Sequence, residues 1–411
     1  MLATIASVDC KIRIITIKSR FIEMFGAFHP ITELEDVCMF VKRGKSATYA
    51  DSSDYYIVGQ ACIRLDCIEF NRVRCMDSSK YSDEYVLKFG DVLVNSTGVG
   101  SLGRCNAFYN PDGRVYFTDS HVTILRLKMN LMDPLFVKYY LNQNGVQADI
   151  YRKCVNGSTN QIELNRGTFA HFLVPVPPLE LQNQFADFVR RVDKSKAICK
   201  QIFQSFDNLV KSRFIEMFED NPESSNWCFS SLESICNGIT DGSHNPPASG
   251  EKSNNLMISS KNIHDGTIDF EDSRYLTDEQ FISENNRTKV QKDDLLMTIV
   301  GTIGRTAIVP DFENNVTFQR SVSVLHPKHE LLNVTYLKES LDTIQPDLER
   351  LAHGSSQKGI YLNQVKAIQI KLPPIELQNQ FADFVKQMNK SKFMSSMTAT
   401  DSASLSEQGL V

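Results

Sequence analysis

The stretch ELQNQFADFV occurs at residues 180–189 and again at 376–385, and it determines how the rest of the chain is interpreted. The match is wider than these ten residues, since PPLELQNQFADFVRRVDKSK at 177–196 corresponds to PPIELQNQFADFVKQMNKSK at 373–392. A long internal match at a fixed separation is the signature of a repeated structural unit. The sequence therefore predicts that one unit occurs twice in this chain.

Weaker matches before each copy extend the repeat. They pair GSTNQIELN (157–165) with GSSQKGIYLN (354–363), DVLVNSTGVGSLGR (91–104) with DDLLMTIVGTIGR (293–305), HVTIL (121–125) with SVSVL (321–325), and SRFIEMF at 19–25 with SRFIEMF at 212–218. The chain is thus a tandem duplication of about 195 residues. Each unit has a divergent globular part and a near-identical end.

The near-identical end is predicted to be a long helix, because no Pro or Gly interrupts residues 180–218. Its apolar residues recur at steps of three and four, which is typical of a coiled-coil seam. We expect the seam to pack against the second helix or a partner; it comprises Leu181, Phe185, Phe188, Val192, Cys199, Ile202, Phe206 and Leu209, and in the second copy Leu377, Phe381 and Phe384.

The second copy loses this pattern after about residue 393, and the N-terminal SRFIEMF supplies the missing end. We therefore expect a second long helix split between the chain ends, in a pseudo-twofold arrangement. The predicted divisions are 1–26 for the N-terminal part of the split helix, 27–179 and 219–375 for two globular domains, 180–218 for the central helix, 376–394 for the short C-terminal helix, and 395–411 for a disordered tail.

The globular parts are predicted to be α/β with mixed short strands and helices. VLVNST, VTILRL, LLMTIV and SVSVL are rich in β-branched and aliphatic residues between turn signals. Residues 132–144 and 333–344 have helical patterns. Near-identical helices with divergent domains suggest a constant scaffold that presents two different binding surfaces.

Composition places the chain among soluble globular proteins, with 42% hydrophobic and 23% charged residues. No stretch approaches the ~18 apolar residues of a membrane helix, and Asp9, Lys11 and Arg13 make the N-terminus a poor signal peptide. The ten cysteines form no CxxC pair. We expect reduced thiols, a cytoplasmic protein and no metal site.

The formal net charge of −5 is unusual for a nucleic-acid binder, where a basic surface is the usual footprint. Any DNA binding must therefore use local basic clusters or positive charge from a partner protein.

Two motifs that suggest an enzyme lack their structural context. Residues 98–103 match GxGxxG, but the Asn-Pro-Asp-Gly stretch at 110–113 predicts a hairpin where a dinucleotide site needs a helix. Asn-Pro-Pro-Ala at 245–248 is similar to the Asn-Pro-Pro-aromatic loop of amino-methyltransferases but lacks the aromatic residue. We find no catalytic constellation and expect a non-enzymatic chain.

The arrangement as a whole resembles the specificity (S) subunit of type I restriction–modification systems. The resemblance covers nearly the whole chain. It rests on PPLELQ and PPIELQ at the helix starts, the Gly-Ser stretches upstream of them, the two SRFIEMF segments, and ITDGSH at 239–244.

This resemblance implies two target recognition domains, each reading one half of a bipartite double-stranded DNA site, separated by an antiparallel coiled coil. It also implies a non-catalytic chain that binds no cofactor itself. The expected partners are two DNA adenine-N6 methyltransferase subunits, which use S-adenosylmethionine, and a restriction subunit that translocates DNA with ATP and Mg²⁺.

Candidate DNA-binding residues are chosen by chemistry, because phosphates attract Lys, Arg and hydroxyls, and base edges pair with Arg, Lys, Asn and Gln. In the first domain they are Lys42, Arg43, Lys45, Tyr49, Ser96, Thr97, Arg104, Asn156, Ser158, Thr159 and Gln161. In the second they are Ser243, His244, Asn245, Lys261, Asn262, Arg305, Gln319, Arg320, Ser355, Ser356, Gln357 and Lys358. Base-reading residues should differ between the repeats, whereas Arg104 and Arg305 are shared and fit phosphate contact or a structural ion pair better.

Three alternatives remain open from sequence. The chain could serve a fused nuclease–methyltransferase, act as an autonomous DNA methyltransferase, or be an inactive or recombined allele that works only as a scaffold. The atypical ends favour the last of these, since residues 1–18 do not match 194–211 and the Ser/Thr-rich end after Lys392 loses the heptads.

Overall fold

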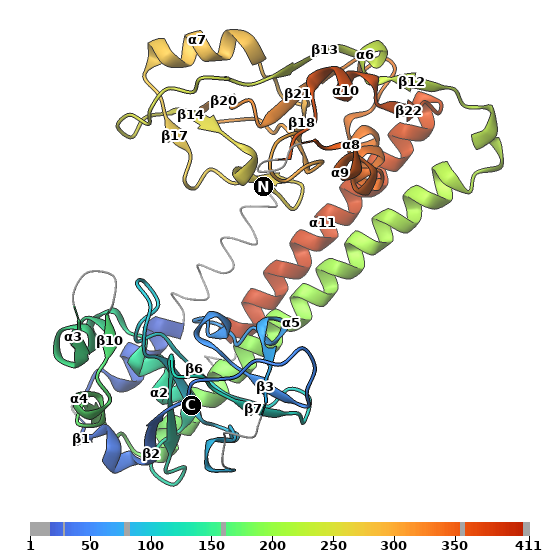
Figure 1. The fold of residues 1–411 in the computed structure, drawn as a ribbon. Helices are drawn as coiled ribbons and strands as arrows, with labels where there is room; N and C mark the ends of the chain where they lie inside the picture. Colours follow the sequence, from blue (N-terminus) through green and yellow to red (C-terminus); the bar gives the residue numbers. More distant parts are fainter. Residues whose placement is uncertain (1–16, 28, 78–82, 158–161, 354–357, 406–411) are drawn as a thin grey trace. The chain divides into compact units, whose positions relative to one another are not determined.

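The computed structural model describes residues 17–27, 29–77, 83–157, 162–353 and 358–405. The described residues divide between Lys194 and Ser195 into two compact units, an N-terminal unit from Ile17 to Lys194 and a C-terminal unit from Ser195 onward. Each unit contains its own sheets and helices (Figure 1). None of the helices in the described ranges has the length and apolar character needed to cross a bilayer.

The N-terminal unit is built on two small sheets. One is antiparallel with the order β2-β8-β5-β6, and the other has the order β4-β3-β7, in which β3 and β7 are parallel. The strands are β2 (Cys38–Arg43), β3 (Tyr55–Ile57), β4 (Arg74–Cys75), β5 (Val92–Asn95), β6 (Cys105–Ala107), β7 (Val115–Phe117) and β8 (Val122–Leu127).

Both faces of the larger sheet are covered, and for this reason every residue of its central strands β5 and β8 is buried. Val92 and Val94 of β5 face a cluster formed with the helices, whereas Leu93 between them faces a second cluster with β3 and β7. Alternate residues of a strand point to opposite faces, so a strand covered on both sides has no exposed face.

The C-terminal unit repeats this topology. Its sheets have the orders β13-β21-β18-β19 and β17-β14-β20, with β14 and β20 parallel. A register shift between Cys236 and Gly238 matches the one between Cys38 and Phe40. The strands are β13 (Cys236–Asp241), β14 (Asn255–Ile258), β17 (Arg274–Tyr275), β18 (Leu295–Thr298), β19 (Thr306–Ile308), β20 (Asn315–Phe318) and β21 (Val322–Pro327). The duplication predicted from the sequence is therefore also a duplication of fold.

Helices and short pairings complete each unit. The N-terminal unit has a helix over 17–25, α2 (Pro134–Leu141), α3 (Asn144–Cys154) and α4 (Arg166–Ala170), and pairs β1 (Ile31–Glu33) with β11 (Leu173–Pro175) and β9 (Val155–Asn156) with β10 (Glu163–Leu164). The C-terminal unit has α6 (Leu232–Ile235), α7 (Asp278–Thr288), α8 (Val334–Thr343), α9 (Gln345–Leu351) and α10 (Leu362–Ala367), and pairs β12 (Phe229–Ser231) with β22 (Gln369–Lys371) and β15 (Ile263–His264) with β16 (Thr267–Ile268).

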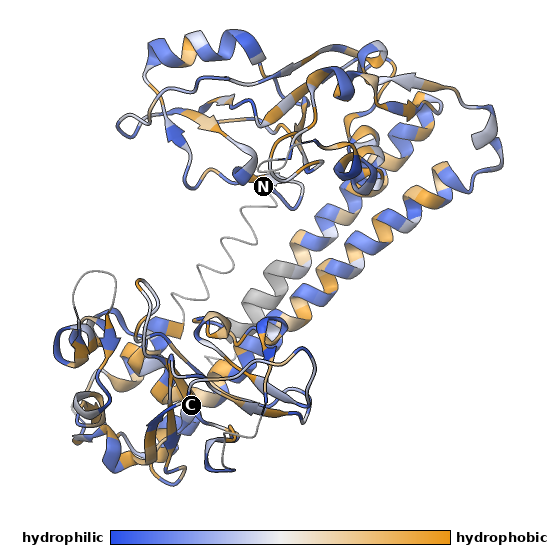
Figure 2. Cartoon of the chain, in the orientation of Figure 1, coloured by the Kyte–Doolittle hydropathy of each residue, from blue (hydrophilic) through white to orange (hydrophobic). Residues whose placement is uncertain are grey.

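The two long helices form as predicted, with different ends. Helix α5 spans Leu179–Phe214 and passes into a π-helical turn at Ile215–Glu219. Helix α11 spans Ile375–Leu405, so the predicted helix end at 394 is wrong, and residues 395–405 of the predicted tail are helical. The rest of that tail, 406–411, lies outside the described residues. Loss of the heptad pattern removes an apolar seam, but no Pro or Gly in that stretch stops the helix. Figure 2 shows apolar and polar residues alternating along both helices.

Within the C-terminal unit, the end of α5 and the start of α11 run antiparallel. Arg213 lies over the Phe384 ring, and further along α11 the Lys392 ammonium reaches the Asp207 carboxylate at 2.8 Å and lies over Phe203. As the residue number rises on one helix, the contacting number falls on the other.

A buried glutamine joins the start of each long helix to its globular domain. The Gln182 side chain is fully buried; its oxygen accepts the Asp133 backbone N–H at 2.9 Å, and its amide donates to the Leu131 carbonyl at 3.0 Å and the Pro177 carbonyl at 2.8 Å. Both ends of the amide are therefore satisfied inside the unit, and the helix start is tied to the loop before α2.

The second glutamine makes the same three bonds. Gln378 accepts from the Asn333 backbone N–H at 2.9 Å and donates to the Leu331 carbonyl at 3.1 Å and the Pro373 carbonyl at 2.8 Å. The glutamine of PPLELQ and PPIELQ is thus a structural joint.

An aromatic cluster surrounds each joint and explains the repeated SRFIEMF. Phe185 lies edge-on to Phe21 and Phe25, with ring centroids 5.1 and 5.6 Å away. In the C-terminal unit the Phe381 ring lies edge-on to Phe214 and Phe218, at 5.5 Å from each. Each SRFIEMF therefore closes the core over the start of a long helix.

Replacing one glutamine joint should destabilise its own unit. In Gln378→Ala the Asn333 N–H and two carbonyls lose their buried partner, which costs about 1–3 kcal/mol for an unsatisfied group. Trp227 is the only tryptophan and packs on Phe218, so its fluorescence during urea unfolding follows the C-terminal unit. We expect a lower midpoint for Gln378→Ala and an unchanged one for Gln380→Ala, an exposed neighbour; equal midpoints would contradict the structural role.

The buried acid of each larger sheet has a different partner in the two units. Asp91 is paired by the Arg126 guanidinium at 2.8 Å, whereas the equivalent Asp294 is paired by the His326 imidazole at 2.8 Å. The hydrogen bond to Asp294 raises the pKa of His326 above 6.5, although burial opposes this. Only the C-terminal unit therefore has a titratable partner at this position.

The stability of the C-terminal unit should depend on pH through His326. A histidine whose folded pKa is raised stabilises the fold below its ordinary pKa of 6.5, and this contribution is lost as the pH rises through the folded value. We expect the Trp227 unfolding midpoint to fall from pH 6 to pH 8 by more in the natural protein than in His326→Arg, which copies the arginine of the other unit. Parallel pH profiles for the two proteins would rule out this linkage.

Candidate functional site

Each unit contains an open cavity beside its smaller sheet. The N-terminal cavity has a volume of about 720 Å³ and is lined by Tyr49, Ile57, Gly59, Gln60, Ala61, Cys62, Arg72, Arg74, Thr97, Asp119 and His121. The C-terminal cavity has a volume of about 540 Å³ and is lined by Ser249, Met257, Ser259, Lys261, Asn262, Asp272, Ser273, Arg274 and Gln319.

The two cavities occupy the same place in the duplicated fold. Ile57 and Met257 are equivalent residues of β3 and β14, and the strand pairings β3–β7 and β14–β20 have the same parallel register. All but one of the residues lining the C-terminal cavity fall 200 positions after a residue lining the N-terminal one; the exception is Ser273. Arg74 and Arg274 are the one identical pair.

In the N-terminal cavity, a chain of hydrogen bonds positions the polar groups. The Thr97 hydroxyl donates to the Gln60 side-chain oxygen at 2.7 Å and lies 2.9 Å from His121 Nδ1. Asp119 accepts the His121 backbone N–H at 2.9 Å. The Arg74 guanidinium stacks on the Tyr49 ring at 3.4 Å from its centroid. The lining combines positive charge, an aromatic face and one carboxylate.

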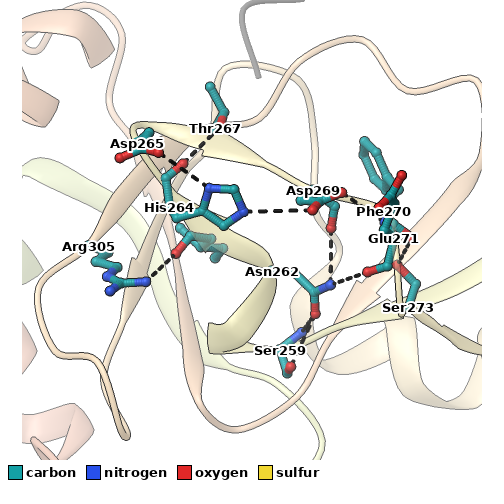
Figure 3. A network of polar contacts seen from close by, with 11 residues as sticks. Ser259, Asn262, His264, Asp265, Thr267, Asp269, Phe270, Glu271, Ser273 and Arg305 are labelled. Carbon is teal, nitrogen blue, oxygen red and sulfur yellow. Dashed lines mark hydrogen bonds and ion pairs between the residues drawn. The ribbon is translucent and has the colours of Figure 1, made fainter. Parts of the chain in front are cut away.

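The C-terminal cavity has a floor that is fully hydrogen-bonded (Figure 3). The Asn262 amide donates to the Asp269 carbonyl at 3.0 Å and the Glu271 carbonyl at 2.9 Å, and its oxygen accepts from the backbone N–H and the hydroxyl of Ser259, each at 3.1 Å. These four bonds use the whole capacity of the amide. Asn262 therefore shapes the cavity and has no bonding group left for a ligand.

The groups available for a ligand lie around that floor. Within the described ranges, the Lys261 ammonium and the Gln319 side-chain amide form no hydrogen bond or ion pair with the protein, and Lys261 is exposed. Arg274 is held by the carbonyls of Pro246 and Pro247, so it positions the 245–248 loop. Asp272, which is exposed, also forms no hydrogen bond or ion pair with the described protein. Lys261, Asp272 and Gln319 are thus charged or amide side chains of the lining that are free to bind.

The structure brings together five of the residues that the sequence predicted. Tyr49 and Thr97 line the first cavity, and Lys261, Asn262 and Gln319 line the second. Sequence reasoning missed Arg72, Arg74, Asp119 and His121. An alignment of the repeats from residue 49 onward would have placed Arg74 opposite Arg274 and Asp119 opposite Gln319.

The basic segment before the first cavity is largely neutralised. Lys42 pairs with Glu84, Arg43 pairs with Glu163, and Lys45 lies over the Tyr85 ring at 4.8 Å. The hydrogen bond from Lys42 also lowers the pKa of the Glu84 carboxyl. DNA contact by these cations, which remains a prediction, would compete with the existing pairs.

Several other predicted residues have structural partners. Ser96 is buried and its hydroxyl lies 2.6 Å from that of Thr123; Ser243 is buried beside Gln319. The Arg104 and Arg305 guanidinium groups donate to the carbonyls of Gly100 at 2.9 Å and Ile263 at 3.4 Å (Figure 3 shows the latter arginine). His244 lies 2.7 Å from Asp241 and 3.1 Å from Arg287.

The remaining predicted residues are exposed or not described. Asn156, Asn245, Arg320 and Lys358 are exposed. Ser158, Thr159, Gln161, Ser355, Ser356 and Gln357 lie outside the described residues.

The helical seam residues divide into buried and exposed sets. Phe185 and Phe381 belong to the unit cores, and Leu181, Phe188, Val192, Phe206, Leu377 and Phe384 are half-buried. Ile202 and Leu209 are 37% and 48% exposed, and Val210 is buried in place of Leu209. A straight α-helix drifts relative to a 3.5-residue repeat, so a heptad seam extrapolated over many turns ends on the wrong neighbour.

The glycine-rich stretch at 98–103 joins two antiparallel strands. It connects β5 to β6, whose register pairs Val94 with Cys105. No helix opens there, which agrees with the prediction that this is not a dinucleotide loop. The prediction of a hairpin at 110–113 is wrong, because the flanking strands β6 and β7 belong to different sheets.

Comparison with known proteins identifies the repeated unit. The family model of the type I restriction modification DNA specificity domain matches residues 31–205 and again 226–396. The chain belongs to this family. It contains two copies of the domain, and the matched ranges contain both cavities and both glutamine joints.

Curated members of the family align over much of the chain. The MjaX type I restriction enzyme specificity subunit of Methanocaldococcus jannaschii is 22% identical over 383 residues, covering 87% of this chain and 86% of that protein. The EcoBI specificity subunit of Escherichia coli is 26% identical over 276 residues, covering 58% of this chain and 56% of that protein.

A solved structure has a similar fold. The type I restriction–modification S subunit from M. genitalium superposes with a TM-score of 0.50 at 13% identity, covering 92% of this chain and 93% of that one. At this identity the similarity concerns the fold alone.

A glycine beside each cavity allows two backbone segments to approach closely. A Cβ on Gly44 would overlap the carbonyl oxygens of Thr118 and Asp119, and one on Gly242 would overlap the backbone of Phe318 and Gln319. These glycines therefore hold the ends of β2 and β13 against the segment that carries Asp119 or Gln319.

Gly242→Ala should destabilise the C-terminal unit and displace Gln319, because the new methyl group overlaps the Phe318 carbonyl and the backbone must move. Overpacking of this kind costs about 1–3 kcal/mol. Urea unfolding followed by Trp227 fluorescence should show a lower midpoint. Gly250→Ala is the control, since the nearest atom to its Cβ is 3.6 Å away and its midpoint should be unchanged. If Gly242→Ala unfolded at the same urea concentration as the natural protein, the close packing at this glycine would be contradicted.

Proposed function

We propose that this chain reads a bipartite double-stranded DNA target, with one half-site recognised by each unit. The observation that carries the proposal is the presence of two DNA specificity domains in one chain, at residues 31–205 and 226–396. The units share their strand order, glutamine joint and aromatic cluster, and they differ in the lining of the cavity. Two unlike reading surfaces on one scaffold fit two unlike half-sites.

The long helices are proposed to set the distance between the half-sites as an antiparallel coiled coil with pseudo-twofold symmetry. Helix α5 has 36 residues, about 54 Å at ~1.5 Å per residue. The contacts of Arg213 with Phe384 and of Lys392 with Asp207 support an antiparallel pair. The exposed Ile202 and Leu209 are available to a partner helix on the outside of this pair.

The chain is proposed to act without a catalytic site of its own, inside the cytoplasm, as the recognition subunit of a larger complex. Two DNA adenine methyltransferase subunits would supply methyl transfer from S-adenosylmethionine, and a restriction subunit would supply ATP- and Mg²⁺-dependent translocation and cleavage. The net charge of −5 supports a need for partner cations around the DNA phosphates. The EcoBI and MjaX relatives are named as specificity subunits of type I restriction enzymes, which supports the same assignment.

The proposal is tested by expressing the chain with the methyltransferase subunit from its own genome in a host that lacks related systems. We expect the two proteins to co-purify, and methylome sequencing to show N6-methyladenine at a split motif with a methylated base in each half. Each half-site should be unrelated in sequence to the other, because the two cavity linings differ.

Two controls separate the outcomes. The chain expressed alone should leave the host DNA unmethylated, whereas methylation without the partner would favour an autonomous methyltransferase. A stable complex that methylates no motif would favour an inactive allele that acts only as a scaffold, and failure to form a complex would overturn the proposed partner.

A further inference from the structure

We infer that the two equivalent cavities are the base-reading surfaces, and that the residues differing between them set the sequence of each half-site; this rests on the proposed function. The cavities lie at the same place in each unit, beside the parallel pairs β3–β7 and β14–β20. The scaffold around them is repeated and their lining is not. That is the pattern required of a surface that recognises two different sequences.

The substitutions between the cavities change hydrogen-bonding chemistry. At equivalent positions Ala61 is replaced by Lys261, Arg72 by Asp272, and Asp119 by Gln319. Charge and donor–acceptor pattern are the properties by which side chains distinguish base edges. Ile57 and Met257, at equivalent positions of β3 and β14, differ in shape but are both apolar.

One pair of equivalent residues, Arg74 and Arg274, is identical, and both side chains bind groups of the protein. Arg74 stacks on the Tyr49 ring, and Arg274 binds the carbonyls of Pro246 and Pro247. Both arginines hold the loop that forms one wall of the cavity. Their role is therefore to position the wall, and base discrimination belongs to the residues that vary.

The C-terminal cavity provides the sharpest assignment. Asn262 has no bonding capacity left (Figure 3 shows its hydrogen bonds), so the charged and amide side chains available within the described residues are those of Lys261, Asp272 and Gln319, of which Lys261 and Gln319 can donate to purines. A glutamine amide pairs with the N6 and N7 edge of adenine, and a lysine donates to O6 or N7 of guanine. We therefore expect purines in the half-site read by this unit. In the N-terminal cavity, Asp119 is suited to accept from cytosine N4. The Arg72 Nε pairs with the Glu69 carboxylate at 2.6 Å, and its remaining N–H groups are suited to donate to guanine.

The test uses the complex of the full chain with its methyltransferase subunit, which selects from a library of randomised duplex DNA. Gln319→Ala and Lys261→Ala should each relax base preference by roughly 10- to 100-fold at one or two positions of one half-site. The other half-site and the gap should not change. Arg72→Ala should relax base preference in the half-site read by the N-terminal unit and leave the other half-site unchanged.

Matched controls are exposed residues of the same type outside the cavities. Lys292→Ala and Gln291→Ala change an exposed lysine and an exposed glutamine of the C-terminal unit, and neither should alter the selected motif. Co-purification and Trp227 unfolding midpoints confirm that each C-terminal cavity variant is folded and assembled. For Arg72→Ala, the retained motif in the other half-site provides that confirmation.

The outcomes distinguish this inference from the proposed function. Suppose that the natural complex selects a split motif and that all three cavity variants select the same motif. The cavities would then not be the reading surfaces, while the proposed function would still hold. A uniform loss of affinity with unchanged base preference would show phosphate contact and overturn the inference in the same way. If the natural complex selects no split motif, the proposed function fails and the inference fails with it.

Discussion

The hydrogen bonds of the buried Gln182 amide, and of its counterpart in Gln378, join each long helix to its globular domain. Each amide is removed from water and must find partners, and it finds them on both the helix start and the loop before the next helix. The helix is thereby attached to its domain at a defined angle. The aromatic rings of SRFIEMF then pack over the same junction and exclude water from it.

Maintaining the fold and binding a ligand are two requirements that usually constrain the same residues, and in this chain they fall on different residues. The sheets, the joint and the close approach at Gly44 and Gly242 are the same in both units, so they maintain the fold. In the cavity lining, Lys261 and Gln319 do not maintain the fold through hydrogen bonds, because their polar ends form no bonds within the described protein. Asn262 shows the limit of this freedom, because a polar residue in a cavity is not available for binding when its own bonds are complete.

The candidate site could be predicted only in part for this reason. Choosing residues by chemical type found Lys261, Gln319, Tyr49 and Thr97, but it also selected Ser96 and Ser243, whose side chains are buried within the fold. Residue type does not reveal exposure, and exposure depends on which strands become neighbours. Asp119 and His121 were missed because they are far in sequence from Tyr49 and the β3 loop, and only the parallel pairing of β3 with β7 brings them to one cavity.

The sequence alone determined that the chain is a duplication, that each unit ends in a long helix, and that the glycine-rich stretch at 98–103 is not a dinucleotide loop. These properties depend on local patterns, namely identity at a fixed separation, apolar periodicity and the spacing of glycines. The tertiary structure alone decided that the seam passes through Val210 and not Leu209, and that equivalent cavities exist. The physical reason is that burial and cavity shape arise from contacts between segments distant in sequence, and a periodic pattern describes only one segment at a time.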